Sequence, residues 1–161
     1  MLPKKLFYSE DYISLGLLIL RIGVGIAFIC HGFPKLFMGG APHLAKGLAA
    51  AGIPGGVFAA YLSGMAEFFG GIFLIAGLLF RPTAIVMTIN MAVALGFHFS
   101  MGAPFLEYSH ALESGILFLS FILIGPGEFS LDRRLFGEQE AEEIQPKECH
   151  QGIPSPSRLT V

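Results

Sequence analysis

The sequence is poor in charged residues and has no tryptophan. Of its 161 residues 14% are charged and 53% are hydrophobic, and the mean hydropathy is +0.67. A soluble domain carries charge on about a quarter of its residues. With a net charge of −2, the chain also lacks the basic excess that binds nucleic acid. We therefore expect an integral membrane protein with no nucleic-acid partner.

Motifs typical of soluble enzymes are absent as well. The sequence has no G-x-S-x-G elbow, no phosphate-binding glycine loop and no dinucleotide fingerprint. Its two cysteines, Cys30 and Cys149, fall at the outer end of a span and in the tail, so no disulfide between them is expected. The first apolar run follows Lys4 and Lys5 as in a signal peptide, but it is too long, contains Arg21 and lacks a small-x-small cleavage site. We interpret this run as a membrane span.

Four apolar stretches approach the roughly 20 residues that a helix needs to cross about 30 Å of hydrocarbon. They cover Ile13–His31, Val57–Phe80, Thr83–Met101 and Glu107–Ile124. Residues 42–56 form a moderately apolar connector that is expected to hold a short interfacial helix. Arg81 and Pro82 are expected to make a tight turn between the second and third spans. The prediction is an all-α protein, an integral membrane four-helix bundle.

Composition divides the chain into three parts. Residues 1–11 are an N-terminal segment, residues 12–130 the four-span domain, and residues 131–161 a polar tail that is expected to be disordered. An even number of spans puts both termini on one side, together with most of the basic residues outside the spans. That side holds Lys4, Lys5, Arg81, Arg133, Arg134, Lys147 and Arg158, and the other side holds Lys35 and Lys46. Because cytoplasmic loops are rich in lysine and arginine, both termini are predicted to be cytoplasmic.

Three polar residues are expected near the middle of the membrane. At about 1.5 Å per residue, Arg21, Glu67 and Asn90 each lie about 15 Å below the outer end of their span. Because an isolated charge at that depth costs at least about 2.5 kcal/mol, Arg21 and Glu67 are expected to pair, with Asn90 as a third partner. The pair could fix the packing of the first two spans or belong to a quinone, proton or substrate site. Residue types alone leave both interpretations open.

A second polar group is expected at the outer interface. His31 and Lys35 close the first span, His98 lies near the end of the third, and Glu107 and His110 begin the fourth. Such a set could bind an anion, relay protons or hold a metal. The spacing Glu107-x-x-His110 puts both side chains on one helical face, as in di-iron bundles, but those bundles use two such pairs and further glutamates. We therefore predict no metal site.

Several sequence motifs resemble those of a known membrane family. They are LGLLILRIGVGIAFICHGFPKLF at residues 15–37, GLAAAGIP at 47–54, LSGMAEFFGGIFLIAGLLFRPTA at 62–84 and GPGEFSLDRRL at 125–135. Over about residues 12–136 the chain resembles the DoxX/DoxD family of four-helix membrane proteins. That family includes the large subunit of thiosulfate:quinone oxidoreductase and a subunit of membrane-associated oxidoreductase complexes. The resemblance implies a link to membrane redox and sulfur metabolism, although His110 departs from the family pattern.

Our first hypothesis is a quinone-linked oxidoreductase, or a subunit of one, that acts on a small sulfur anion such as thiosulfate. Because no cofactor motif is present, a quinone would be the direct oxidant, or a second subunit or soluble redox partner would supply the redox centre. The residues assigned catalytic roles are His31, Glu67, His98 and Glu107. Those assigned to substrate binding are Arg21, Lys35 and His110.

Two alternatives belong to other functional classes. One is a non-catalytic membrane scaffold that docks soluble redox enzymes through Arg133, Arg134 and the acidic tail. The other is a small-molecule permease, which with four spans would need to oligomerise. All three functions place the chain in a lipid bilayer, and we expect a bacterial or archaeal cytoplasmic membrane.

Overall fold

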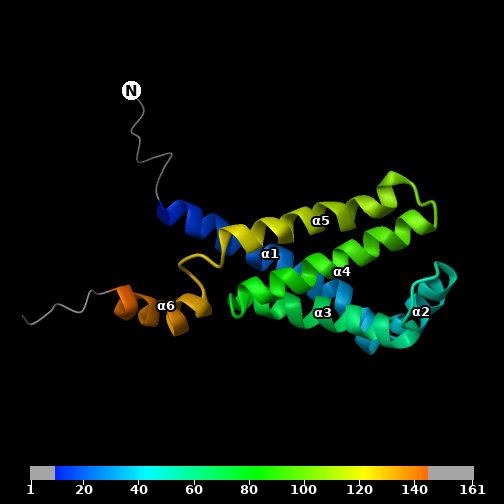
Figure 1. The fold of residues 1–161 in the computed structure, drawn as a ribbon, viewed down its shortest axis with the longest axis horizontal. Helices are drawn as coiled ribbons and strands as arrows, with labels where there is room; N and C mark the ends of the chain where they lie inside the picture. The colour runs from blue at the N-terminus through cyan, green and yellow to red at the C-terminus, as the bar shows by residue number, and fades with distance from the viewer. Residues whose placement is uncertain (1–9, 145–161) are drawn as a thin grey trace, which may run out of the picture.

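The structure is a computed structural model that describes residues 10–144, and it folds them into helices alone (Figure 1). The helices are α1 (Glu10–Phe37), α2 (Gly40–Ala50), α3 (Gly56–Ala76), α4 (Phe80–Ser100), α5 (Phe105–Ile124) and α6 (Leu131–Ile144). No strand occurs within residues 10–144. The all-α prediction is therefore confirmed.

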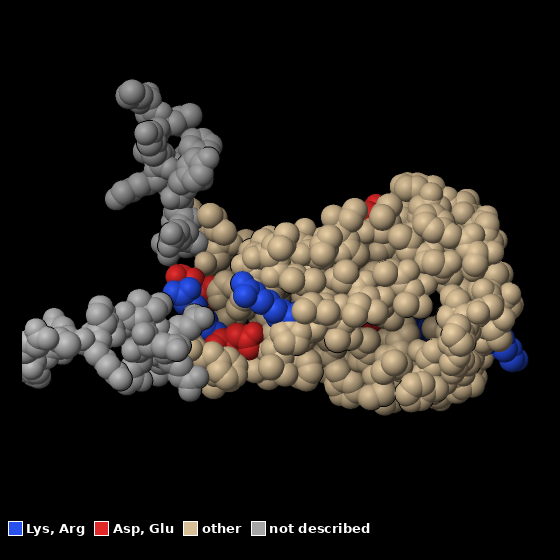
Figure 2. Space-filling view, viewed as in Figure 1, with Lys and Arg blue, Asp and Glu red and all other residues tan. Residues whose placement is uncertain are grey.

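Four of these helices are long and apolar enough to cross a membrane. They are Tyr12–Phe37 of α1 and the whole of α3, α4 and α5. Their outward faces carry exposed apolar side chains such as Ile26, Leu62, Ile89 and Ile116. Charged groups gather mainly at the end of the molecule where α6 leaves the bundle (Figure 2). A lipid bilayer solvates such a surface, whereas water would not. The predicted integral membrane bundle is therefore confirmed.

The spanning helices pair along their lengths. α1 packs along α3, α4 packs along α5, and α2 covers part of α3. The start of α1, the turn between α3 and α4, and α6 lie at one end of the bundle, which we call the terminal end (Figure 1). α2 lies at the opposite end, which we call the α2 end. The side of the membrane that each end faces stays a prediction.

Glycines let α1 and α3 approach closely. A Cβ atom on Gly25 would lie 2.6 Å from the carbonyl oxygen of Gly71. A Cβ atom on Gly32 would lie 2.5 Å from the nitrogen of Phe68 and 2.8 Å from the oxygen of Gly64. Small residues at such crossings allow van der Waals contact between backbones in a membrane. This contact sets the register of α1 against α3.

Two predicted helix boundaries were wrong. α1 continues past His31 to Phe37 and contains Pro34. A proline removes one backbone hydrogen bond and usually breaks a helix, but spanning helices tolerate it where neighbouring helices pack around the freed backbone groups. The turn expected at residues 81–82 lies instead at residues 77–79, where Gly77 and Leu79 have positive φ angles of 65° and 47°. Residues 81 and 82 form the first turn of α4, where the fixed φ of proline is tolerated.

The prediction that residues 131–161 are disordered was wrong for the first part of this segment. Residues 131–144 form α6, and the start of this helix is anchored at the terminal end. The nitrogen of Asp132 donates to the Gly77 oxygen at 2.9 Å, and Ser130 Oγ accepts from the Arg133 nitrogen at 3.2 Å, as in an N-cap. Hydrophobic periodicity does not report such contacts. Residues 145–161 and 1–9 lie outside the described residues, whereas the helix expected in the 42–56 connector is confirmed as α2.

Candidate functional site

A buried carboxylate lies in the middle of α3. Glu67 is 4% exposed, and Lys35 Nζ on α1 lies 2.6 Å from each of its carboxylate oxygens. Asn90 Nδ2 on α4 donates to Oε1 at 3.2 Å, and Ser63 Oγ lies 3.5 Å from Lys35 Nζ. We call these four residues the Glu67 cluster. Its side chains come from three helices, so its geometry depends on how those helices pack.

The predicted pairing of Arg21 with Glu67 was wrong, because Lys35 takes that place. The depth estimate assumed that the first span ends at His31, whereas α1 runs on to Phe37. Lys35 therefore stays on the helix and reaches Glu67. Arg21 lies about 21 Å farther along the axis at about 1.5 Å per residue. Asn90 is confirmed as a partner of Glu67.

Arg21 instead joins three segments at the terminal end. Its side chain is 1% exposed, and its guanidinium donates to the carbonyl oxygens of Pro126, of Phe129 at 2.7 Å and of Ile75 at 3.4 Å. The guanidinium carbon also lies 5.8 Å from the centroid of the Phe80 ring. Charge-assisted bonds to carbonyls are strong enough to hold a buried guanidinium. Arg21 thus connects α1, the end of α3 and the loop before α6, away from the other predicted site residues.

A cavity of about 580 Å³ lies beside the Glu67 cluster, between α2, α3 and α4. The molecular surface is hollowed next to α2 (Figure 2). The polar groups on the cavity wall are the Glu67 cluster and His98, and the remaining lining residues are apolar. Four of those apolar residues, Leu62, Val86, Ile89 and Val93, are also exposed on the outer faces of α3 and α4. The cavity therefore opens toward the lipid.

The other predicted outer residues fall elsewhere. The His31 and His110 rings lie 4.9 Å apart between α1 and α5, and Phe28 stacks on His110 at 5.8 Å. Both histidines and Glu107 are exposed, and none of the three lines the cavity. Within the described residues there is no group of three or more His, Cys, Asp or Glu side chains able to hold a metal. The structure thus divides the predicted outer layer into the His31–His110 pair, the exposed Glu107 outside the cavity, and His98 in the cavity.

Sequence reasoning missed two parts of the cavity. Ser63 lies one helical turn before Glu67, a spacing that places both side chains on one face of α3. The α2 wall includes Leu44 and Leu48, which have the same spacing in the connector. Both signals are present in the sequence but are common in any helix. They become informative only when the three helices are placed together.

The chemistry available at this site is that of a polar cluster at the edge of an apolar cavity. An amine, an amide and an imidazole supply hydrogen-bond donors, and the apolar walls suit a ring or chain dissolved in the bilayer. The distance of 2.6 Å between Lys35 Nζ and Glu67 is within the range for proton exchange. The cavity therefore suits a mainly apolar molecule that carries hydrogen-bond acceptors, next to two groups that lie close enough to exchange a proton with each other.

Comparison with known proteins finds bacterial membrane proteins. The chain is 32% identical over 127 residues to the inner membrane protein YphA of Escherichia coli K12, covering 73% of this chain and 89% of the relative. It is 33% identical over 125 residues to the inner membrane protein YqjF of the same organism, covering 76% and 93% of the two chains. An uncharacterized protein of Haemophilus influenzae is 33% identical over 133 residues, covering 79% and 96%. No solved structure matches the chain.

A family profile, as distinct from the individual relatives above, also matches the chain. The DoxX family profile matches residues 16–101, which is more than half of the chain and includes Lys35, Glu67, Asn90 and His98. The inner membrane relatives agree with the four apolar helices and with a location in the cytoplasmic membrane. On these grounds the chain belongs to the DoxX family of membrane proteins.

Proposed function

We propose that the chain is a quinone-linked membrane oxidoreductase, or the quinone-binding subunit of one. The observation that carries this proposal is the cavity between α2, α3 and α4, which has apolar walls, opens toward lipid and holds a buried Lys–Glu pair at its polar end. A quinone head group is an apolar ring with carbonyl oxygens, and it reaches its site through the membrane. The size and polarity of the cavity fit such a group.

The side chains around the cavity have different roles in this proposal. The side chain of Lys35 is 25% exposed and that of Glu67 is 5% exposed, so Lys35 is the group that faces the cavity. Lys35, Asn90 and His98 orient a carbonyl oxygen by donating hydrogen bonds. Glu67 balances the charge of Lys35 as a carboxylate. After Lys35 gives up a proton, Glu67 returns one to it only once the carboxylate has itself taken up a proton from water outside the cavity. When bound, a quinone supplies the redox chemistry by accepting two electrons and two protons to become a quinol.

The resemblance to the thiosulfate:quinone oxidoreductase subunit suggests a small sulfur anion as electron donor. Two thiosulfate ions join through a new S–S bond to form tetrathionate and release two electrons, which with two protons reduce one quinone. Because Glu67 already balances Lys35, the cavity offers no free lysine charge to an anion. The anion therefore binds at the α2 end, where His31 and His110 are exposed, or binds to a second subunit.

A photoreactive azidoquinone tests the binding proposal on the purified full-length protein in lipid nanodiscs. We expect saturable labelling of α3 and α4 that excess quinone prevents. Ala66→Phe, which fills the cavity, should abolish labelling, whereas His43→Gln on the exposed face of α2 should leave it intact. Absence of saturable labelling, or equal labelling of the Ala66→Phe variant, would overturn the proposal.

An activity assay tests the electron donor separately. We expect reduction of a soluble quinone analogue by thiosulfate, with loss of at least tenfold in rate in Glu67→Gln and with His43→Gln unchanged. Quinone labelling without thiosulfate activity would retain the quinone site and reject thiosulfate as the donor. Thermal unfolding of each variant in detergent verifies that it is folded.

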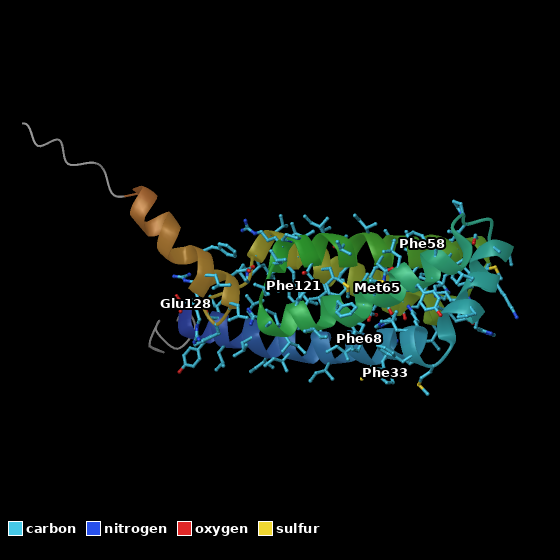
Figure 3. The ribbon with its side chains drawn as sticks, turned by 90° about the horizontal axis from the view of Figure 1, so that it is seen from below. Phe33, Phe58, Met65, Phe68, Phe121 and Glu128 are labelled. Atoms are coloured by element: carbon cyan, nitrogen blue, oxygen red, sulfur yellow. The ribbon has the colours of Figure 1, made fainter. Side chains whose placement is uncertain are left out.

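The scaffold alternative rests on α6. This helix projects away from the bundle (Figures 1 and 3), and Arg133 and Arg134 on it are exposed. If the chain docks soluble redox enzymes, replacing Arg133 and Arg134 by glutamine and removing residues 138–161 should together abolish their co-purification from membranes, and Ala66→Phe should have no effect. The opposite pattern supports the quinone site.

A further inference from the structure

We propose that a second cavity, at the terminal end, binds the phosphate head group of an anionic phospholipid. This cavity has a volume of about 860 Å³ and lies between the start of α4, the loop at residues 125–127 and the first turns of α6. Arg81 and Arg133 contribute to its wall, beside the apolar side chains of Leu79, Ile124 and Phe136. A wall that joins guanidinium groups to apolar surface matches a lipid head group and the first part of its acyl chains.

The cavity lies at the level where lipid head groups are found. α4 has 21 residues and α5 has 20, so each is about 30 Å long, which is the thickness of the hydrocarbon core. Arg81 lies in the first turn of α4, and Gly125 directly follows α5. A Cβ atom on Gly125 would lie 3.4 Å from Arg81 Nη2, so the guanidinium lies over the end of α5. The cation is therefore held at the membrane surface.

The charge of Arg81 is available for a ligand. Asp132 also lines the cavity, but its two carboxylate oxygens accept hydrogen bonds from the Leu79 and Phe80 nitrogens at 2.7 and 2.8 Å. It thus caps α4. None of the ion pairs between described side chains involves Arg81. A phosphate can approach this arginine without displacing an ion-pair partner among the side chains of residues 12–137.

Arg133 provides a second guanidinium at small energetic cost. Its Nη2 atom lies 3.6 Å from Glu128 Oε1, and the two side chains are 61% and 41% exposed. Exposed pairs at such distances stabilise a protein by little, so a phosphate can replace the carboxylate. Guanidinium groups bind phosphate oxygens through paired hydrogen bonds. Basic pockets beside spanning helices recognise phospholipid head groups in this way.

Thermal unfolding of the full-length protein in detergent tests the proposal, with phosphatidylglycerol, phosphatidylcholine or inorganic phosphate added. We expect phosphatidylglycerol to raise the unfolding temperature and to remain bound in native mass spectrometry, and we expect little effect from the other two. Arg81→Gln should weaken phosphatidylglycerol binding about tenfold or more, because a charge-assisted contact is lost. Arg134→Gln, an exposed arginine of α6 outside the cavity wall, should bind as the native protein does.

Three results would overturn the inference. Equal stabilisation by phosphatidylglycerol and phosphatidylcholine would show that the cavity does not distinguish the two head groups. Equal protection by inorganic phosphate would show that a free anion is sufficient and that the lipid is not the ligand. Equal affinities of Arg81→Gln and Arg134→Gln would place binding elsewhere. If Arg81→Gln unfolds early without lipid, Arg133→Gln provides the same comparison, because this residue lies on the cavity wall and is 61% exposed.

Discussion

Replacing Lys35 by methionine should destabilise the bundle strongly. The substitution keeps most of the length of the side chain but removes the cation that lies 2.6 Å from both Glu67 oxygens. Glu67 would keep only the hydrogen bond from Asn90, in a site where its side chain is 5% exposed. Leaving one member of a buried pair without its partner costs about 3–5 kcal/mol. We expect a loss of that size in the free energy of unfolding.

Replacing Glu67, the other member of the pair, should lower the free energy of unfolding by less. Glu67→Gln leaves an ammonium group on Lys35, whose side chain is 25% exposed and long enough to turn toward the α2 end. We expect a loss of about 1–2 kcal/mol, close to that of an ordinary buried hydrogen bond. The double variant Lys35→Met, Glu67→Met removes both charges and should lie within about 1 kcal/mol of the native protein, because apolar side chains often replace a buried pair without loss.

Equilibrium unfolding in mixed micelles with increasing amounts of SDS measures these free energies. The double-mutant cycle isolates the coupling between the two residues. Lys46→Met serves as the control, since Lys46 is an exposed lysine of α2, and it should change stability by less than about 0.5 kcal/mol. Two results would refute this reasoning. In one, Lys35→Met has the same free energy of unfolding as the control. In the other, the double variant loses as much free energy of unfolding as the two single variants together, which would mean that Glu67 does not depend on Lys35.

Two further predictions concern the helix contacts that frame the site. Arg21→Met should lower the free energy of unfolding by about 3–5 kcal/mol in the same micelle titration, because two close charge-assisted bonds to carbonyl oxygens are worth about 1.5–3 kcal/mol each. Gly32→Val should lower it by at least about 1–3 kcal/mol, because its Cβ would lie within 2.5 Å of the α3 backbone.

Each of these substitutions has a matched control. Arg134→Met changes an exposed arginine, and Gly23→Val places a side chain on α1 where no atom lies within 4 Å. Both controls should stay within about 0.5 kcal/mol of the native protein. A Gly23→Val loss as large as that of Gly32→Val would mean that helix propensity, and not contact with α3, sets the cost. Equal stability of Arg21→Met and Arg134→Met would exclude the carbonyl contacts as a source of stability.

The terminal end illustrates how one interaction can serve several elements. Asp132 caps α4 with its side chain and binds the Gly77 oxygen with its backbone nitrogen. Arg21 holds the carbonyls of the same loop. Glu128, by contrast, lies on the outside of this end and Phe121 among the helices (Figure 3). The Gly-Pro-Gly loop thus connects the spans to α6 through backbone contacts that need few large side chains.

Much of the fold follows from the sequence alone. The number of spans, their approximate positions and the helix between the first two depend on local hydropathy, which each segment carries by itself. A helix in lipid satisfies its own backbone hydrogen bonds, so a long apolar segment has little choice of structure. The pairing of Glu67 with Asn90 was also accessible, because both lie near the middle of spans whose outer ends were placed almost correctly.

The partner of Glu67 and the shape of the cavity were decided only by the tertiary structure. Whether a helix continues through Pro34 depends on the contacts around it, and those six additional residues of α1 moved Lys35 to the carboxylate and Arg21 to the terminal end. The glycines that set the register of α1 against α3 act through distances between backbones, which no residue type encodes by itself. Local patterns therefore determined which segments cross the membrane, whereas the packing of the helices determined which polar groups meet inside it.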